Sequence, residues 1–233
     1  MDHLYSPIEA KYFELEKTFG AQNYHPLPVV LKRGLGPFLW DLNDKKYYDF
    51  LSAYSSVNQG HCHPEILKSL FNQASKLTLT SRAFYNDSLG KFEEFICTLF
   101  KYEKVLPMNS GVEAAESAVK LARKWGYEKK RVKKNNAKII FPKNNFWGRS
   151  IAAISSSTNP VAYNNFGPLL HGFETVPYDN LDFLEAKLKN PDCVAFMLEP
   201  IQGEAGVVVP SDGYLSNVKY LCNKYNVLFI ADE

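Results

Sequence analysis

Residues 227–231 read Val227-Leu228-Phe229-Ile230-Ala231, and Asp232 and Glu233 follow at once. An unbroken apolar run of this length, rich in β-branched and aromatic side chains, is typical of a strand buried on both faces of a parallel sheet. Residues 137–141 have the same character, apart from one lysine. The two runs therefore predict parallel strands inside an α/β domain.

Helical and strand patterns alternate after Pro64. The predicted helices cover 64–76, 88–101, 112–127, 180–189 and 213–225, and the predicted strands cover 104–108, 137–141, 193–198 and 227–231. Parallel strands need crossover connections, which are usually helices. The alternation therefore predicts an α/β fold in which helices flank a mainly parallel sheet.

The N-terminal part has a different pattern. Residues 5–18 carry apolar side chains at helical spacing, and three short runs at 29–31, 37–41 and 46–50 are separated by turn residues. Such runs predict a small antiparallel meander. We therefore expect a helix and meander in residues 1–55 and an incomplete large domain in 56–233, because the chain ends on an apolar strand with no helix to cover it. This ending predicts a fragment of a longer protein.

Composition narrows the classes of partner. The chain has 233 residues, of which 27 are basic and 25 acidic. The charges are interspersed except for a lysine-rich cluster at 129–134, which we interpret as a solvated connection, so no nucleic-acid partner is expected. No apolar run is long enough to predict a membrane span.

Cysteine spacing and the N-terminal residues bear on compartment. The four cysteines are far apart, which predicts a reducing compartment. His61-Cys62-His63 is a weak metal pattern because no second ligand cluster accompanies it, so no metal is predicted. The acidic N-terminal stretch predicts a cytoplasmic protein, with a mitochondrial one possible if a leader precedes Met1.

The start of the predicted helix 112–127 is a candidate anion site. Asn109-Ser110-Gly111-Val112-Glu113 precedes and opens this helix, and free N–H groups at a helix start bind phosphate. Alternatively, Ser110 is only an N-cap and Glu113 completes a capping box.

Two further segments are expected at the same edge of the sheet. Residues 145–149 follow the strand 137–141, and Asp232 follows the strand 227–231. Open α/β sheets bind ligands beyond the carboxyl ends of their strands. An anion cradle, an aromatic ring, a guanidinium and a carboxylate together suit an aromatic phosphorylated cofactor, because a carboxylate keeps a pyridine nitrogen protonated.

Four segments carry a family resemblance: 109–116 with 120–123, 146–149, 199–206 and 230–233. Together they resemble the class III aminotransferases, which belong to the fold-type-I superfamily of pyridoxal 5'-phosphate enzymes. Segments 23–29, 51–61 and 79–85 are similar to the members of this family that act on ornithine. The resemblance runs from about residue 19 to the end.

The resemblance implies site residues. Cofactor binding is implied for Ser110, Gly111, Val112, Phe146 and Asp232, with Asp232 also the catalytic partner of the pyridine nitrogen; substrate binding is implied for Tyr24, Tyr54, Arg149 and Glu204. Of these, Arg149 would bind the α-carboxylate of ornithine, and Glu204 would pair with an arginine later in the chain. The alternative is that the tyrosines are half-buried, that Phe146 and Trp147 fill the core, and that Arg149 pairs with a surface carboxylate. Glu199 fits either a site role or a hydrogen bond to nearby backbone.

The resemblance also implies an activity. The complete protein is expected to be a homodimer that transfers the terminal amino group of ornithine to 2-oxoglutarate, giving glutamate semialdehyde and glutamate. The Schiff-base lysine of the family lies beyond Glu233, so this chain alone is expected to be inactive. Two alternatives stay open: a class III enzyme acting on acetylornithine, 4-aminobutyrate or lysine, and a non-catalytic truncated product.

Overall fold

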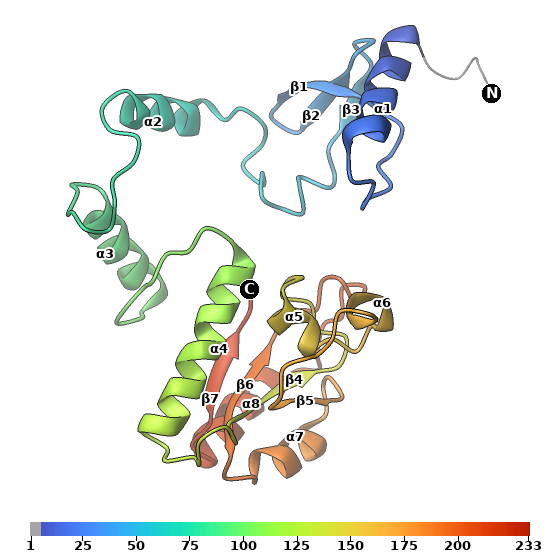
Figure 1. Cartoon of the computed structure of the whole chain (residues 1–233). Coiled ribbons are helices and arrows are strands. Elements are labelled where there is room, and N and C mark those ends of the chain that lie inside the picture. The colour runs from blue at the N-terminus through green and yellow to red at the C-terminus, as the bar shows by residue number, and fades with distance from the viewer. Residues whose placement is uncertain (1–5) are drawn as a thin grey trace. The chain divides into compact units, whose positions relative to one another are not determined.

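The structure, a computed structural model, describes residues 6–233 and is shown in Figure 1. The chain forms two compact units, the first ending at Phe95 and the second running from Ile96 to Glu233. The predicted division of the chain after residue 55 stays a prediction. The helices are α1 (Pro7–Phe19), α2 (Pro64–Ala74), α3 (Leu89–Phe100), α4 (Gly111–Glu128), α5 (Ile151–Ser155), α6 (Pro160–Tyr163), α7 (Leu181–Leu188) and α8 (Tyr214–Lys224). The strands are β1 (Leu31–Leu35), β2 (Phe38–Asp41), β3 (Lys46–Tyr48), β4 (Lys138–Pro142), β5 (Phe173–Val176), β6 (Cys193–Leu198) and β7 (Leu228–Ala231).

The first unit contains the predicted N-terminal helix and meander. Helix α1 begins with a capping box, in which Ser6 Oγ accepts from Glu9 N at 3.4 Å and the Glu9 carboxylate accepts from Ser6 N at 2.9 Å. Residue 5 of the predicted helix lies outside the described residues. Strands β1, β2 and β3 pair antiparallel in that order, so the predicted meander is confirmed. The predicted first run, 29–31, is wrong in its bounds, because β1 begins at Leu31 and continues to Leu35.

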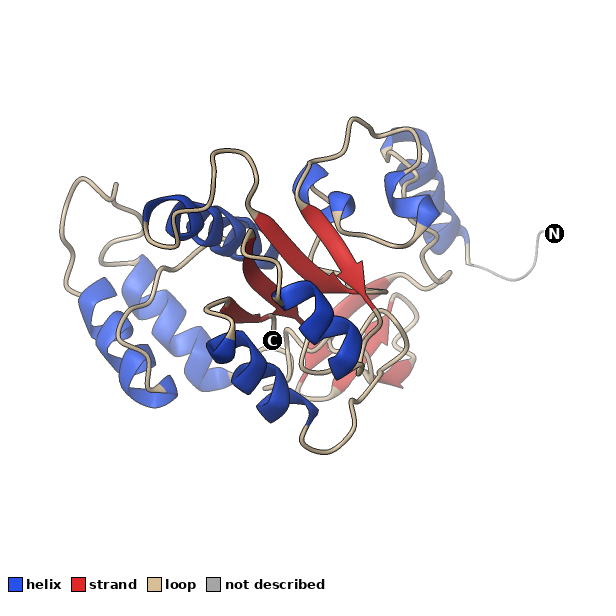
Figure 2. Cartoon of the chain, turned by 90° about the horizontal axis from the view of Figure 1, so that it is seen from below, coloured by secondary structure: helices blue, strands red, loops and turns tan. Residues whose placement is uncertain are grey.

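The second unit is built on a four-stranded parallel sheet. Its order is β5-β4-β6-β7. Helices lie on both faces of this sheet (Figure 2). One core cluster joins α4 and α5 to Ile139, Phe141 and Met197, and the other joins α7 and α8 to Ile140 and Phe196. Neighbouring residues on one strand thus pack on opposite faces, and the predicted α/β fold is confirmed.

Some predicted elements are wrong or missing. Residues 104–108 form no strand, and within 6–233 no strand pairs with them. Their backbone groups have no ladder to join, whatever their apolar content. Strand β5 and the short helices α5 and α6 were not predicted, because elements of four or five residues give little periodic signal.

Helix α4 packs closely against β6 at Gly126. A Cβ added there would overlap Val194 Cγ1 and lie 3.1 Å from Val194 Cβ. We therefore expect Gly126→Ala to lower the free energy of unfolding by about 1–3 kcal/mol through overpacking. Urea unfolding would measure this, and Val194→Ala in the same chain should recover part of the loss. Gly90→Ala is the matched control, since a Cβ at this helical glycine meets nothing within 4 Å; a similar loss there would contradict the packing explanation.

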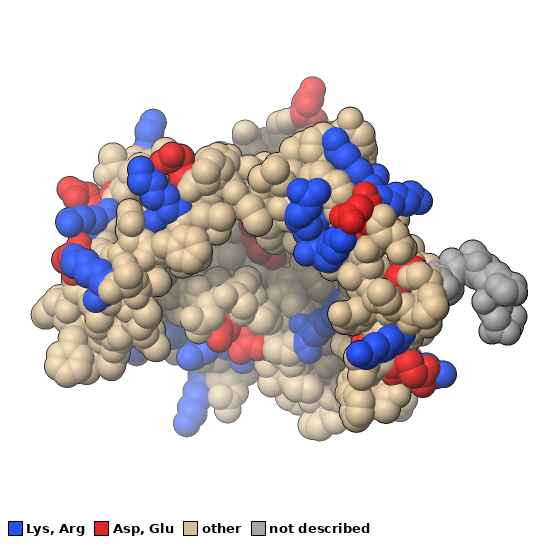
Figure 3. Space-filling model, turned by 90° about the horizontal axis from the view of Figure 1, so that it is seen from above, with Lys and Arg blue, Asp and Glu red and all other residues tan. Residues whose placement is uncertain are grey.

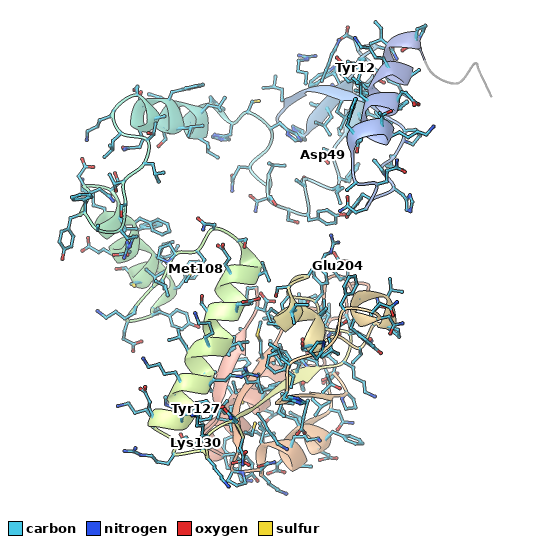
Figure 4. The ribbon with its side chains drawn as sticks, viewed as in Figure 1. Tyr12, Asp49, Met108, Tyr127, Lys130 and Glu204 are labelled. Carbon is cyan, nitrogen blue, oxygen red and sulfur yellow. The ribbon has the colours of Figure 1, made fainter. Side chains whose placement is uncertain are left out.

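The lysine-rich segment after α4 is partly structural. Lys130 Nζ donates to the carbonyl oxygens of Cys193 at 2.6 Å and Tyr225 at 3.3 Å, while Lys129, Arg131, Lys133 and Lys134 are exposed. Figure 4 labels Lys130 at the end of α4. The interpretation of this cluster as a solvated connection is therefore wrong for Lys130.

On the face shown in Figure 3, basic and acidic side chains are interspersed.

All four cysteines are free thiols, and Cys193 and Cys222 are buried. None of the helices within residues 6–233 combines the length and the apolar character needed to cross a bilayer.

Candidate active site

The carboxyl ends of β4, β6 and β7 meet at one edge of the sheet. Ala231 pairs with Leu198, and Asp232 N donates to Leu198 O at 2.9 Å, so Asp232 and Glu199 follow neighbouring strands at the same level. Residues 143–149 leave the adjacent strand β4 at this edge. The predicted convergence of these segments is confirmed.

The first turn of α4 has unused N–H groups. Ser110 is the N-cap, its Oγ accepting from Glu113 N at 3.4 Å and its carbonyl from Ala114 N at 3.1 Å. The Glu113 carboxylate accepts from Asn109 N at 2.8 Å, not from Ser110 N, so the capping box is not formed. For Gly111 and Val112, no acceptor of the N–H is recorded among residues 6–233. Both donors, with the positive end of the helix dipole, are available to an anion.

Gly111 and Asp232 line the same cavity in the second unit. It has a volume of about 750 Å³, and Ala115, Met197 and Ile230 form part of its apolar wall. Burial raises the pKa of the Asp232 carboxyl above its usual range. The helix start and the strand-end carboxylate therefore lie within reach of one small molecule, while their roles toward a cofactor stay predictions. Phe146, Arg149 and Glu204 are not among the residues that line this cavity.

Two adjacent aromatic residues after β4 have opposite environments. Trp147 is 6% exposed, stacks on Phe141 at a centroid distance of 5.9 Å, and donates from Nε1 to Ser156 Oγ at 2.7 Å. Phe146 is 40% exposed. The alternative that these residues fill the core is thus right for Trp147 and wrong for Phe146.

The loop that carries Phe146 packs on the first turn of α4. Gly148 has φ of +136°, and a Cβ on it would overlap Val112 Cγ2 and lie 2.7 Å from Val112 Cβ. The Arg149 guanidinium lies 5.9 Å from the centroid of the Phe146 ring, and Arg149 is exposed. Close packing at Gly148 therefore holds the backbone of this loop against the helix start.

Glu199 joins two loops of the site. Its Oε2 accepts from Phe146 N at 3.1 Å and its Oε1 accepts from Gly203 N at 3.2 Å. Burial raises the pKa of this carboxyl, and the charges of Asp232 and Glu204 raise it further. The hydrogen bond to nearby backbone that the sequence left as one option is therefore present. Glu204 is exposed on the turn after Gly203, at the same edge of the sheet (Figure 4).

Two residues that sequence reasoning missed support these loops. Tyr178 donates from its hydroxyl to the carbonyls of Glu199 at 3.1 Å and Pro200 at 2.9 Å, and burial raises its pKa to about 12. Gln202 is buried and donates from Nε2 to Lys143 O at 2.9 Å. The chain position of Tyr178 gave no signal because it follows β5, which was not predicted.

Tyr24 and Tyr54 belong to the first unit. Their hydroxyl oxygens lie 2.8 Å apart, and both side chains are exposed. Tyr24 is 52% exposed and Tyr54 65% exposed, so the half-buried alternative fits Tyr24 better than Tyr54. Their implied role in substrate binding stays a prediction.

The His61-Cys62-His63 pattern has a different explanation from metal binding. Within residues 6–233 no group of three or more His, Cys, Asp or Glu side chains could hold a metal ion. His61 Nε2 instead lies 2.6 Å from Asp49 Oδ2, a short hydrogen-bond distance.

Comparisons with known proteins agree with this geometry. The profile of the aminotransferase class-III family matches residues 19–233. The mitochondrial ornithine aminotransferase of Drosophila melanogaster is 62% identical over 218 residues, which are 94% of this chain and 51% of that protein. Among solved structures, an ornithine aminotransferase from Toxoplasma gondii superposes with a TM-score of 0.94 at 49% identity, and an acetylornithine aminotransferase from Elizabethkingia anophelis with 0.83 at 52% identity. The superposition with the Toxoplasma gondii enzyme covers 98% of this chain and 54% of that one. The superposition with the Elizabethkingia anophelis enzyme covers 97% of this chain and 53% of that one.

The relatives also differ from this chain in length, and one of their structures contains a cofactor. The chain spans about half the length of the curated relatives it matches. Another structure of the Toxoplasma gondii enzyme records partial occupancy of pyridoxal phosphate at the active site.

Proposed function

Since this chain belongs to the class III aminotransferase family, we propose that the whole protein transfers the terminal amino group of ornithine to 2-oxoglutarate. The products are glutamate semialdehyde and glutamate. The observation that carries the proposal is the single cavity lined by Gly111 at the helix start and Asp232 at the strand end. The identity of 62% to a relative named ornithine aminotransferase supports the choice of amine.

Pyridoxal phosphate, the cofactor of this family, fits the residues present. The N–H groups of Gly111 and Val112, next to the N-cap Ser110, would bind the phosphate. The Asp232 carboxylate would pair with the ring nitrogen, and the exposed Phe146 ring would lie against the ring face. When bound, this cofactor supplies a protonated ring that takes up electrons from a neighbouring carbanion.

The environment of Asp232 matches a catalytic role. Burial alone favours the neutral form of the Asp232 carboxyl. A cationic ring nitrogen beside it would favour the anion instead. The same pairing holds the proton on that nitrogen. We infer that Asp232 is the catalytic residue of this chain.

The substrate residues follow from their charge and position. The planar guanidinium of Arg149 would bind the α-carboxylate of ornithine through two hydrogen bonds, which leaves the terminal amine to react. Tyr24 and Tyr54 would line the amine-binding region, where their paired hydroxyls favour ornithine over acylated relatives. Glu204 would pair with an arginine outside these residues and so select which carboxylate binds.

Assays of the whole protein test the proposal. Purified protein with pyridoxal phosphate should produce glutamate semialdehyde from ornithine faster than it turns over acetylornithine, 4-aminobutyrate or lysine. A higher kcat/KM for acetylornithine would support the second candidate, which the 52% identity to the Elizabethkingia enzyme favours. We propose that residues 1–233 alone are inactive, because the family resemblance implies that the lysine that carries the cofactor lies beyond Glu233.

A substitution at Tyr54 tests specificity. We expect Tyr54→Ile to reduce the preference for ornithine over acetylornithine by about tenfold, because an apolar side chain no longer discriminates by hydrogen bonding. The ratio of the two kcat/KM values measures this. Tyr220→Ile is the control, since Tyr220 is 64% exposed and Tyr54 65% exposed; an equal shift in both variants would contradict the role of Tyr54.

The compartment and the oligomeric state stay predictions. Cytoplasmic residence is predicted from the acidic N-terminal stretch, whereas the name of the Drosophila relative places that protein in mitochondria. Imaging of the tagged whole protein and size-exclusion chromatography would decide both.

A further inference from the structure

The loop of residues 50–60, which carries Tyr54, is closed at its base by Asp49 and His61 (Asp49 is labelled in Figure 4). His61 Nε2 lies 2.6 Å from Asp49 Oδ2, and both side chains are mostly buried. The backbones of His61 and Gly36 exchange two hydrogen bonds of 2.9 Å each. Asp49 N donates to Pro37 O, also at 2.9 Å. Both ends of the loop are thus tied to the β1–β2 turn and to each other.

The second oxygen of Asp49 holds the first part of the loop. Its Oδ1 accepts from Leu51 N at 3.1 Å and from Ser52 N at 2.8 Å. These bonds and the one to His61 lower the pKa of the Asp49 carboxyl, with the bond from Ser52 having the largest effect. The carboxylate is therefore ionised at neutral pH and serves three donors at once, which makes these hydrogen bonds stronger than neutral ones.

The loop contains an unusual backbone conformation. Ser52, Ala53, Tyr54 and Ser55 have φ of +49°, +49°, +55° and +68°. Four consecutive non-glycine residues in the left-handed region cost free energy and persist only where the surroundings enforce them. Such strain gathers at sites where a side chain must be held in one place. Tyr54 lies within this strained turn.

Close packing leaves His61 little freedom. A Cβ on Gly34 would lie 2.7 Å from His61 Cγ, and a Cβ on Gly60 would lie 2.9 Å from Gly36 Cα. A cavity of about 220 Å³ lies beside them, and Asp49, Ser52 and His61 are among the residues that line it. The imidazole therefore packs directly against Gly34, and its bond to Asp49 closes the loop base.

We propose that Asp49 and His61 form a clamp that holds the strained turn and thereby positions Tyr54 for the amine substrate. His61 is then a positioning residue for ornithine, acting through Tyr54. The clamp fixes the base of the loop, and the 2.8 Å contact with the Tyr24 hydroxyl fixes its tip. The inference rests on the proposed role of Tyr54 in substrate binding.

Two substitutions at His61 in the whole protein, loaded with pyridoxal phosphate, test the clamp. His61→Leu keeps the size but removes the donor, and His61→Gln keeps a donor that reaches Asp49. In His61→Leu we expect faster hydrogen–deuterium exchange at the amides of 51–57 and a KM for ornithine raised about tenfold. The reason is that the substitution removes an interaction that forms when ornithine binds, before the chemical step. We expect kcat and the KM for 2-oxoglutarate to change less than about twofold, and His61→Gln to recover most of the loss.

A double substitution shows whether His61 acts through Tyr54. Adding His61→Leu to Tyr54→Ile should change the KM for ornithine by less than about a further twofold, because coupled positions are not additive. Fully additive effects would overturn the inference. The control His171→Leu, an exposed histidine in the second unit, should leave exchange at 51–57 and the KM unchanged. If His61→Leu does not fold, Asp49→Asn replaces it, since its amide oxygen still accepts from Leu51 and Ser52.

The outcomes separate this inference from the proposed function. An active wild-type protein whose His61→Leu variant shows unchanged exchange and an unchanged KM would overturn the clamp and leave the function standing. A wild-type protein with no turnover of ornithine would overturn the function and, with it, the role of His61 in substrate positioning. Faster exchange together with a selective rise in the ornithine KM would support both.

Discussion

An Asp232→Asn variant of the whole protein should turn over ornithine about 10²–10³-fold more slowly than the wild type, because a preorganised charge that acts on the reacting system is removed. Asparagine keeps the shape of the side chain but cannot hold a proton on the ring nitrogen by charge pairing. Steady-state kinetics with saturating cofactor would measure the loss. Asp212→Asn, at an exposed position in the same unit, is the control and should keep nearly full activity. An Asp232→Asn variant with normal kcat would contradict the assigned role.

The same substitution should have the opposite effect on stability without cofactor. Burial raises the folded-state pKa of Asp232 above its ordinary value of 3.8, so the folded chain loses stability as the pH rises through that raised pKa. Asparagine carries no charge and avoids this loss. Cofactor-free Asp232→Asn should therefore melt at a higher temperature than wild type at pH 7, with the difference shrinking as the pH falls toward 3.8. Equal melting temperatures across that range would count against a buried carboxylate.

Gly148→Ala should disturb both stability and cofactor binding. The new Cβ would overlap Val112 Cγ2, and the backbone there has φ of +136°, which side-chain-bearing residues rarely adopt. We expect a loss of about 1–3 kcal/mol in the free energy of unfolding from overpacking. We also expect weaker binding of pyridoxal phosphate, since Val112 supplies one of the two unused N–H groups.

Unfolding in urea and a fluorescence titration with the cofactor would measure the two effects. Val112→Ala should partly restore stability in the Gly148→Ala background, because it removes the overlapped methyl group. Gly203→Ala is the control for stability, since a Cβ there meets nothing within 4 Å. A Gly148→Ala protein as stable as the wild type would show that the loop can shift without cost.

The sequence predicted the buried parts of the second unit well. Residues 193–198 were predicted with the observed bounds, because an uninterrupted apolar run has no other stable place in an α/β domain. Strand β5 was missed because it is an edge strand in which Glu174 faces Lys138 and Lys187 and interrupts the apolar pattern. Residues 104–108 look as apolar as a strand, but pairing depends on a neighbouring strand and not on local composition.

The candidate site, too, could be predicted from the sequence only in part. The gathering of the helix start and Asp232 at one edge follows from parallel topology, which periodicity reveals. Which of Phe146 and Trp147 is buried depends on the hydrogen bond from Trp147 to Ser156, which no spacing predicts. The contact between Tyr24 and Tyr54 joins residues 30 positions apart and is likewise beyond sequence patterns.

The two backbone bonds accepted by Glu199 have a consequence for how substrate choice can change. Arg149, proposed to bind the α-carboxylate of ornithine, and Glu204, proposed to select which carboxylate binds, lie on loops that donate to one shared carboxyl group. A change in either loop that breaks its bond to Glu199 removes one of the two contacts that join the loops. We therefore expect a new amine specificity introduced through one loop to need a compensating change in the other.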